Sequence, residues 1–71
     1  MTEYMINVFF SEEDDMWVAE IPDLPGCSAM GSTAERAVSE VHAARDAWLA
    51  AARAGGRSIP EPRTRPATHG T

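Results

Sequence analysis

Basic residues, cysteine and long apolar runs are all scarce in this chain. Its 71 residues include no lysine and six arginines against eleven acids, so the formal net charge is -5. That balance argues against a nucleic-acid binder held by phosphate contacts. The single cysteine, Cys27, cannot form an intrachain disulfide and leaves no cysteine-based metal cluster to consider.

No apolar run approaches the roughly 20 residues that a membrane-spanning helix needs. The first 15 residues lack both the basic start and the cleavage site of a signal peptide. We therefore expect a cytoplasmic protein. A chain of 7.7 kDa has room for one small domain, and its modest core makes it a candidate for help from oligomerisation.

The charges are unevenly spread along the chain. Residues 1–31 contain seven acids and no base, whereas residues 32–71 contain four acids and all six arginines. This asymmetry suggests a cationic partner for one surface, although an acidic face that merely keeps the protein soluble is the other reading.

Alternating apolar residues predict two antiparallel strands. Residues 4–10 and 16–21 both alternate with a period of two, and the polar segment 11–15, which carries four consecutive acids, has the length of a hairpin loop. Two prolines and a glycine stiffen the next connection, residues 22–26. Residues 27–30 are then predicted to form a short third strand, in which Cys27 is a small buried apolar residue.

An alanine-rich segment without glycine or proline predicts one helix that ends at Ala54. Ser32 and Thr33 are both good N-caps, and Ser32 with Glu35 has the form of a capping box. Gly55-Gly56 is the C-cap signal. The predicted core-facing stripe comprises Ala34, Ala37, Val38, Val41, Ala44, Arg45, Trp48 and Ala52.

The predicted fold class is α+β: a three-stranded antiparallel sheet and one long helix, with a possible short fourth strand at Ile59. One helix covers only one face of such a sheet, so we expect the other face, or the sheet edge, to bind a second copy. The residues predicted for this self-interface are Met5, Phe9, Met16, Val18 and Met30. Residues 1–62 form the predicted domain, and residues 63–71 read as a disordered tail.

Three blocks of the sequence resemble the HicB-like antitoxin family. They are Pro-Asp-Leu-Pro-Gly-Cys at 22–27, Gly-Ser-Thr at 31–33 opening the helix, and the Gly-x-x-Ile-Pro-x-Pro ending at 56–62. The blocks occur in the family's order and spacing over residues 4–62. Arg36 departs from the family pattern, which has a glutamate in a Thr-x-x-Glu capping box, and Ser32 with Glu35 is the expected substitute.

The resemblance implies a partial RNase H-like fold without the nuclease carboxylates. It also implies an antitoxin that binds HicA, a small mRNA-cleaving toxin, and that forms dimers or tetramers. Many family members carry a C-terminal DNA-binding segment, but only nine residues follow Pro62 here. We therefore expect no direct nucleic-acid binding from this chain alone.

The residues offer little for catalysis. The four acids at 12–15 are adjacent in a turn and point in different directions, so a solvated loop explains them better than a metal site. His42 has no second ligand one helical turn on, and His69 lies in the tail. We expect no enzyme activity, no metal and no cofactor, and a hydrolase with an RNase H-type site is disfavoured.

Two functions remain open at this stage. The first is an antitoxin-like protein that covers the RNA-binding or catalytic surface of a basic HicA-type toxin. The second is a solitary oligomeric domain of the same fold, acting as a regulatory or scaffolding subunit without a toxin. For the first, the predicted toxin contacts are Glu12, Glu13, Asp14, Asp15, Asp23 and Leu24.

Overall fold

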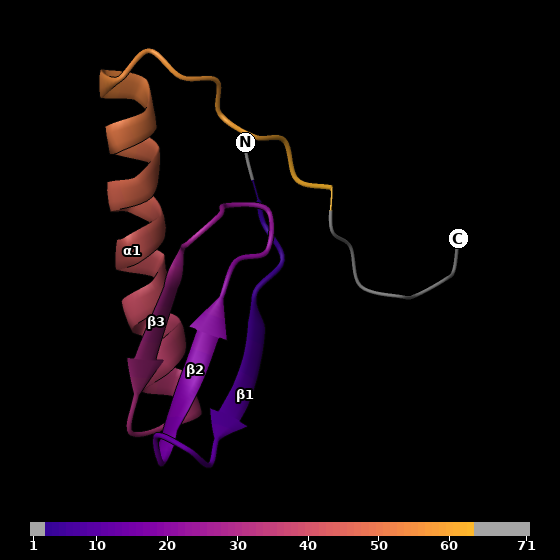
Figure 1. The fold of residues 1–71 in the computed structure, drawn as a ribbon, viewed down its shortest axis with the longest axis vertical. Coiled ribbons are helices and arrows are strands. Elements are labelled where there is room, and N and C mark those ends of the chain that lie inside the picture. The colour runs from indigo at the N-terminus through magenta and orange to yellow at the C-terminus, as the bar shows by residue number, and fades with distance from the viewer. Residues whose placement is uncertain (1–2, 64–71) are drawn as a thin grey trace.

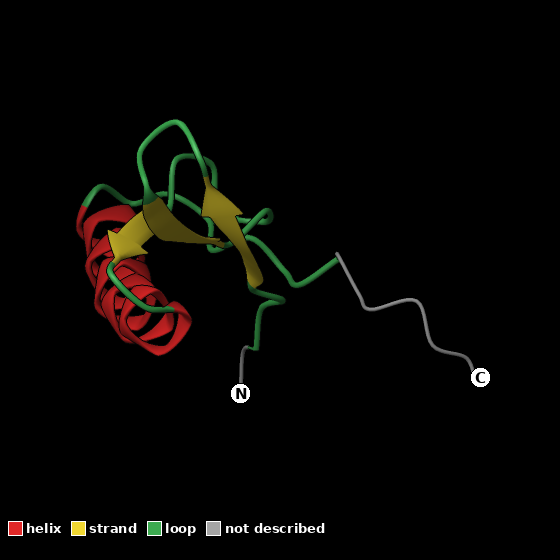
Figure 2. Cartoon of the chain, turned by 90° about the horizontal axis from the view of Figure 1, so that it is seen from below, coloured by secondary structure: helices red, strands yellow, loops and turns green. Residues whose placement is uncertain are grey.

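A computed structural model describes residues 3–63 of the protein. Three strands, β1 (Asn7–Ser11), β2 (Met16–Glu20) and β3 (Ser28–Gly31), form an antiparallel sheet in the order β1-β2-β3. One helix, α1 (Ala34–Ala54), follows them and lies along one face of the sheet (Figures 1 and 2). The predicted α+β fold is therefore confirmed.

The strands pair in the predicted hairpin but have different ends. β1 and β2 pair from Asn7 opposite Glu20 to Ser11 opposite Met16. The first strand was predicted from Tyr4, yet it begins at Asn7. The reason is that Pro22, which has no backbone N–H, turns the chain out of the sheet soon after Glu20, so residues 4–6 have no strand opposite them.

The helix begins with Thr33 as its N-cap. The Thr33 hydroxyl accepts a hydrogen bond of 3.0 Å from the backbone N–H of Arg36. The predicted capping box of Ser32 and Glu35 is therefore wrong, because the cap lies one residue later. Glu35 instead lies in the first turn, where its negative charge complements the helix dipole.

Glycine ends the helix as predicted. The N–H of Gly56 donates to the carbonyl of Arg53 at 3.0 Å, and the N–H of Arg57 donates to that of Ala52 at 2.8 Å. This pair of bonds is a Schellman motif, and Gly56 supplies the left-handed conformation it needs, with φ of 72°.

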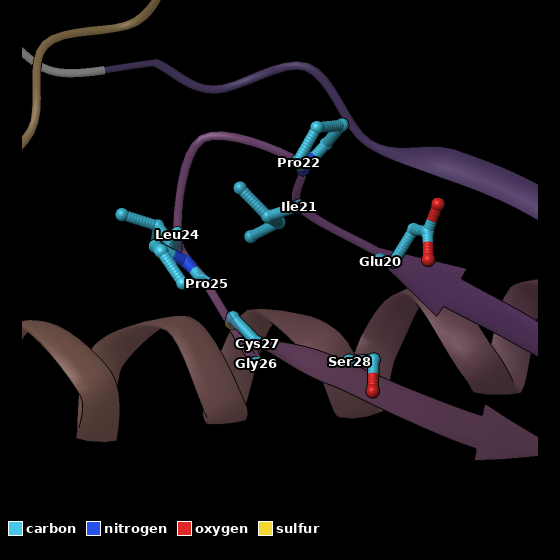
Figure 3. Close-up of a pocket in the computed structure, with 8 residues that line it drawn as sticks. All are labelled: Glu20, Ile21, Pro22, Leu24, Pro25, Gly26, Cys27 and Ser28. Atoms are coloured by element: carbon cyan, nitrogen blue, oxygen red, sulfur yellow. The ribbon is translucent and has the colours of Figure 1, made fainter.

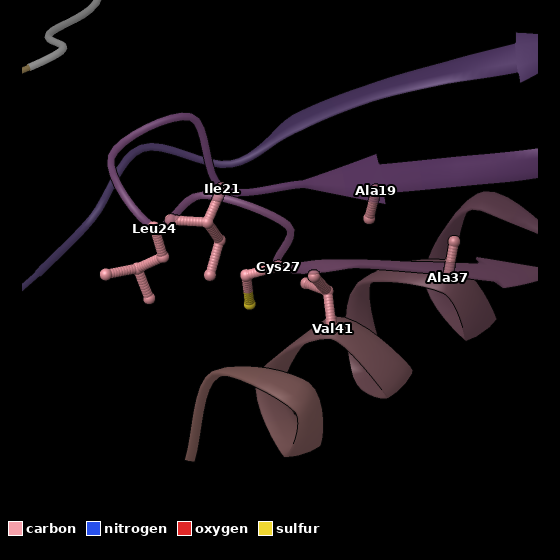
Figure 4. Close-up of a cluster of buried hydrophobic side chains, with 6 residues drawn as sticks. All are labelled: Ala19, Ile21, Leu24, Cys27, Ala37 and Val41. Carbon is pink, nitrogen blue, oxygen red and sulfur yellow. The ribbon is translucent and has the colours of Figure 1, made fainter. Parts of the chain in front are cut away.

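The core lies between α1 and the strands β2 and β3. Its central cluster consists of Ala19, Ile21, Leu24, Cys27, Ala37 and Val41 (Figure 4). The predicted helix stripe is confirmed, because all eight of its residues are buried or half-buried. Trp17 and Trp48 pack against the cluster as half-buried side chains.

Helix and sheet approach one another closely at Gly31. A Cβ atom at this position would lie 2.5 Å from the backbone nitrogen of Ala37. Since the Ala37 nitrogen is a backbone atom that cannot move aside as a flexible side chain would, only glycine allows β3 to lie this near to the start of α1.

Residues 57–63 run back past the loop that joins β2 to β3. Among the contacts that hold this segment, the Tyr4 hydroxyl donates to the carbonyl oxygen of Pro60, and the N–H of Arg63 donates to the Asp23 carboxylate at 3.0 Å. The strand considered at Ile59 is not formed, because these residues extend without pairing to the sheet. Of the predicted tail, residues 64–71 lie outside the described part of the chain. No helix in residues 3–63 is long and apolar enough to cross a membrane.

Candidate protein-binding surfaces

An acidic turn joins β1 to β2. Its residues, Glu12, Glu13, Asp14 and Asp15, are all exposed. The Ser11 hydroxyl donates to the Asp14 carboxylate at 3.1 Å and accepts from the Asp14 N–H at 3.4 Å, and Asp15 adopts a left-handed φ of 54° that aspartate tolerates. The turn therefore concentrates four carboxylates at one tip of the molecule.

The sheet face turned away from α1, here called the open face, carries a row of apolar side chains. Phe9 lies opposite Val18, and Val18 lies opposite Met30, so the three residues form one cross-strand row. Phe9 and Met30 are 45% and 41% exposed, while Met16 and Val18 are half-buried. Met5 precedes β1 and is half-buried. The assignment of these residues to a self-interface stays a prediction.

β1 is the strand least covered by the helix. Val8 and Phe10 lie on the helix side, opposite Ala19 and Trp17, but remain 38% and 43% exposed because α1 packs mainly on β3 and β2. Phe10 makes an edge-on contact with Trp17, with ring centroids 5.5 Å apart. An open groove of about 580 Å³ runs between β1 and the helix and is lined by Val8, Ala34, Glu35, Val38, Ser39 and His42.

The loop at residues 22–26 is a packing element. The N–H of Leu24 donates to the carbonyl of Ile21, and the N–H of Cys27 donates to that of Leu24 at 2.9 Å, so the loop closes on itself. Gly26 takes a positive φ of 80° at its end. The Leu24 side chain is fully buried in the central cluster. The Leu24 side chain therefore packs inside the domain, and the predicted contact between Leu24 and a toxin stays a prediction.

A shallow pocket of about 260 Å³ lies beside this loop (Figure 3). It is lined by Glu20, Ile21, Pro22, Leu24, Pro25, Gly26, Cys27 and Ser28. Asp23 is half-buried and accepts the hydrogen bond from Arg63, so its carboxylate is already engaged within the chain. Of the six predicted toxin contacts, the structure thus groups the four acids of the turn and separates Asp23 and Leu24 from them.

Cys27 is the buried apolar residue that the sequence predicted, at 4% exposure. Burial raises the pKa of its thiol, and the positive charge of Arg45 opposes that shift without cancelling it. The Arg45 guanidinium itself forms an ion pair of 3.1 Å with Asp46. A raised thiol pKa disfavours the thiolate, which is the nucleophilic form.

Residues 3–63 contain no group of three or more histidine, cysteine, aspartate or glutamate side chains arranged to hold a metal. His42 is exposed and lines the groove beside Val38. His69 lies outside the described residues. The surfaces that remain are an acidic turn and exposed apolar side chains, which suit contacts with another protein.

The described residues thus form a small α+β domain whose exposed features are an acidic turn and apolar side chains. The chain belongs to the HicB-like antitoxin family of bacterial toxin-antitoxin systems, whose family profile matches residues 4–68. The match spans all the structural elements described above.

A UPF0150 protein from Synechocystis sp. is 41% identical over 44 residues, which is 62% of this chain. The chain spans about 60% of the length of that curated relative. No solved structure matches the chain.

Proposed function

We propose that this protein neutralises a small, basic, mRNA-cleaving toxin of the HicA type by covering its RNA-binding or catalytic surface. The exposed acidic turn is the observation that supports this function most strongly. A protein that binds RNA presents positive charge to the phosphates, and the same positive surface is attracted to a cluster of carboxylates.

The turn supplies attraction, and the open face supplies apolar contact. Met16 follows the turn directly, and Val18 and Met30 lie beyond it on the open face. The carboxylates steer the encounter, while burial of these side chains slows dissociation. The chain itself carries out no chemistry in this mechanism.

A growth test in the natural genetic context examines the function. The reading frame beside this gene is expressed alone and together with this chain. The proposal requires that the neighbour arrests growth, that this chain restores growth, and that the two proteins co-purify. A neighbour that arrests growth but is neither bound nor silenced by this chain would contradict it and favour a solitary oligomeric domain.

Charge variants examine the acidic turn separately. The E12Q/E13Q variant removes two charges from the turn, and the E40Q/E61Q variant removes two from exposed positions elsewhere. We expect the first to lower the association rate with the toxin about tenfold at low salt and the second to leave it nearly unchanged. Equal effects of the two variants would show that the turn is not the contact.

A further inference from the structure

β1 forms an unprotected edge of the sheet. Its outer side has no strand beside it within residues 3–63, and Figure 1 shows it on the side of the sheet away from α1. Natural proteins usually protect such an edge with charged residues or proline, and the five residues of Asn7–Ser11 contain neither. Three of its side chains, Val8, Phe9 and Phe10, are instead large, apolar and 38–45% exposed.

The polarity of β1 is symmetric about Phe9. Asn7 and Ser11 are polar ends, Val8 and Phe10 are apolar neighbours on the helix side, and Phe9 is an apolar centre on the open face. We propose that a second copy of this chain pairs with β1 in an antiparallel arrangement, with Phe9 opposite the partner's Phe9. The two three-stranded sheets then become one six-stranded sheet.

In this register each side chain lies opposite one of the same polarity. Val8 lies opposite the partner's Phe10, and Asn7 lies opposite the partner's Ser11. A slip of one residue would place Val8 opposite the partner's Phe9 and put the two helices on opposite faces of the joint sheet. A slip of two would set Asn7 opposite an apolar side chain. The symmetric register alone keeps each polar residue opposite a polar one.

Charge favours the antiparallel direction. Parallel pairing would bring the two copies of the turn 12–15 side by side, with eight carboxylates at one end. Antiparallel pairing places the turns at opposite ends of the joint sheet, where both stay exposed. The proposal is therefore independent of whether those turns bind a toxin.

Pairing at the β1 edge accounts for the exposed apolar side chains better than packing of two open faces does. Packing of two open faces would cover Phe9 and Met30 but leave Val8 and Phe10 in water, whereas edge pairing covers three of these four. The opposite edge, β3, has only four residues and packs closely against α1. Of the predicted self-interface, Phe9 then belongs to the contact, and Met16, Val18 and Met30 remain on the joint open face.

Sedimentation equilibrium with two matched variants tests the location. One strand pair is a small interface, so we expect a dissociation constant on the order of 10 µM and a mass near twice 7.7 kDa well above that concentration. F9K places like charges opposite each other and should give monomers, while M30K, at a similarly exposed site on the same face, should stay dimeric. Circular dichroism checks that both are folded. A monomeric wild type, a dimeric F9K or a monomeric M30K would each overturn the proposal.

Engineered cysteines test the register. Opposed Cα atoms in an antiparallel pair lie about 4.5–5.5 Å apart, within reach of a disulfide. Under mild oxidation, F9C should therefore cross-link to a dimer readily, whereas V8C, which faces the partner's Phe10, should cross-link far less. The native Cys27 is buried and common to both variants. Cross-linking of V8C that equals or exceeds that of F9C would overturn the register.

Discussion

The indole Nε1 of Trp48 lies 2.9 Å from the carbonyl oxygen of Pro25 and donates a hydrogen bond to it. The guanidinium of Arg57 lies over the same indole, 5.7 Å from the ring centroid. One side chain of α1 thereby joins the helix to the loop at residues 22–26 and to the segment that follows the helix.

Replacing Trp48 or Arg57 should measure how much these two contacts contribute to the free energy of unfolding. W48F keeps an aromatic ring but removes the N–H donor, so we expect a loss of about 1 kcal/mol in the free energy of unfolding from the hydrogen bond. R57A removes only the cation–π contact and should cost about 0.5 kcal/mol at this exposed site. Urea unfolding followed by circular dichroism compares the two. A W48F variant as stable as the wild type would mean that the hydrogen bond contributes nothing.

Truncation of Leu24 should destabilise the domain severely. The side chain is fully buried, and removal of a buried leucine typically costs about 2–5 kcal/mol. That is a large share of the roughly 4–10 kcal/mol expected for a chain of this size. We expect L24A to be largely unfolded at 37 °C, while I21V, which deletes one methylene in the same cluster, costs about 1 kcal/mol. Thermal melts distinguish these outcomes, and a stable L24A would contradict the packing role of the loop.

Substitution of Gly31 and substitution of Gly26 should each destabilise the protein, for different reasons. G31A places a methyl group 2.5 Å from the backbone of Ala37, so β3 and α1 must separate, at a cost of about 1–3 kcal/mol. G26A meets open space but forces alanine to a φ of 80°, which costs about 1–2 kcal/mol. Hydrogen exchange separates the two: G31A should speed exchange in β3 and the first turns of α1, and G26A only around the loop. Identical exchange patterns would refute the distinction.

Stability should fall in alkaline solution because two groups hold their protons more tightly in the folded chain. Burial raises the pKa of Cys27 above its ordinary value of 9.0, and burial, followed by the negative charge of Asp23, raises the pKa of Tyr4 above 10.0. The unfolded chain therefore releases these protons first, and the free energy of unfolding falls as pH rises above about 9. We expect C27A to remove the part of the fall that begins near pH 9, and Y4F to remove the part that begins near pH 10. A fall that is unchanged in both variants would show that other groups cause it.

The sequence was sufficient to predict the three strands and the helix because residue propensities and the apolar pattern indicated the same elements. Alternation predicted β1 and β2, and the alanine-rich segment bounded by Thr33 and Gly55 predicted α1 with its buried stripe. The choice between Ser32 and Thr33 as N-cap could not be made from residue type, because both residues are good N-caps and stand next to each other in the sequence.

The tertiary arrangement was harder to predict. Alternation placed Val8 and Phe10 on the helix side, but it did not show that α1 would sit over β2 and β3 and leave them partly exposed. Leu24 lies in a short loop between two prolines, where no periodicity marks a residue as buried. The tethers of residues 57–63 join positions 40 and 56 residues apart in the chain, and no local pattern encodes such pairings.

The burial of Leu24 affects what the motif at residues 22–27 indicates about this protein. The Pro-Asp-Leu-Pro-Gly-Cys segment directs its leucine and cysteine inward, so its pattern reports how the domain is assembled. Two proteins that share it have the same interior requirements but need not share a binding partner. Under the two proposals above, partner choice would instead depend on the acidic turn and the outer edge of β1, where a substitution alters the surface and spares the core. Attempts to alter the proposed toxin binding should therefore vary Glu12–Asp15 and leave the loop intact.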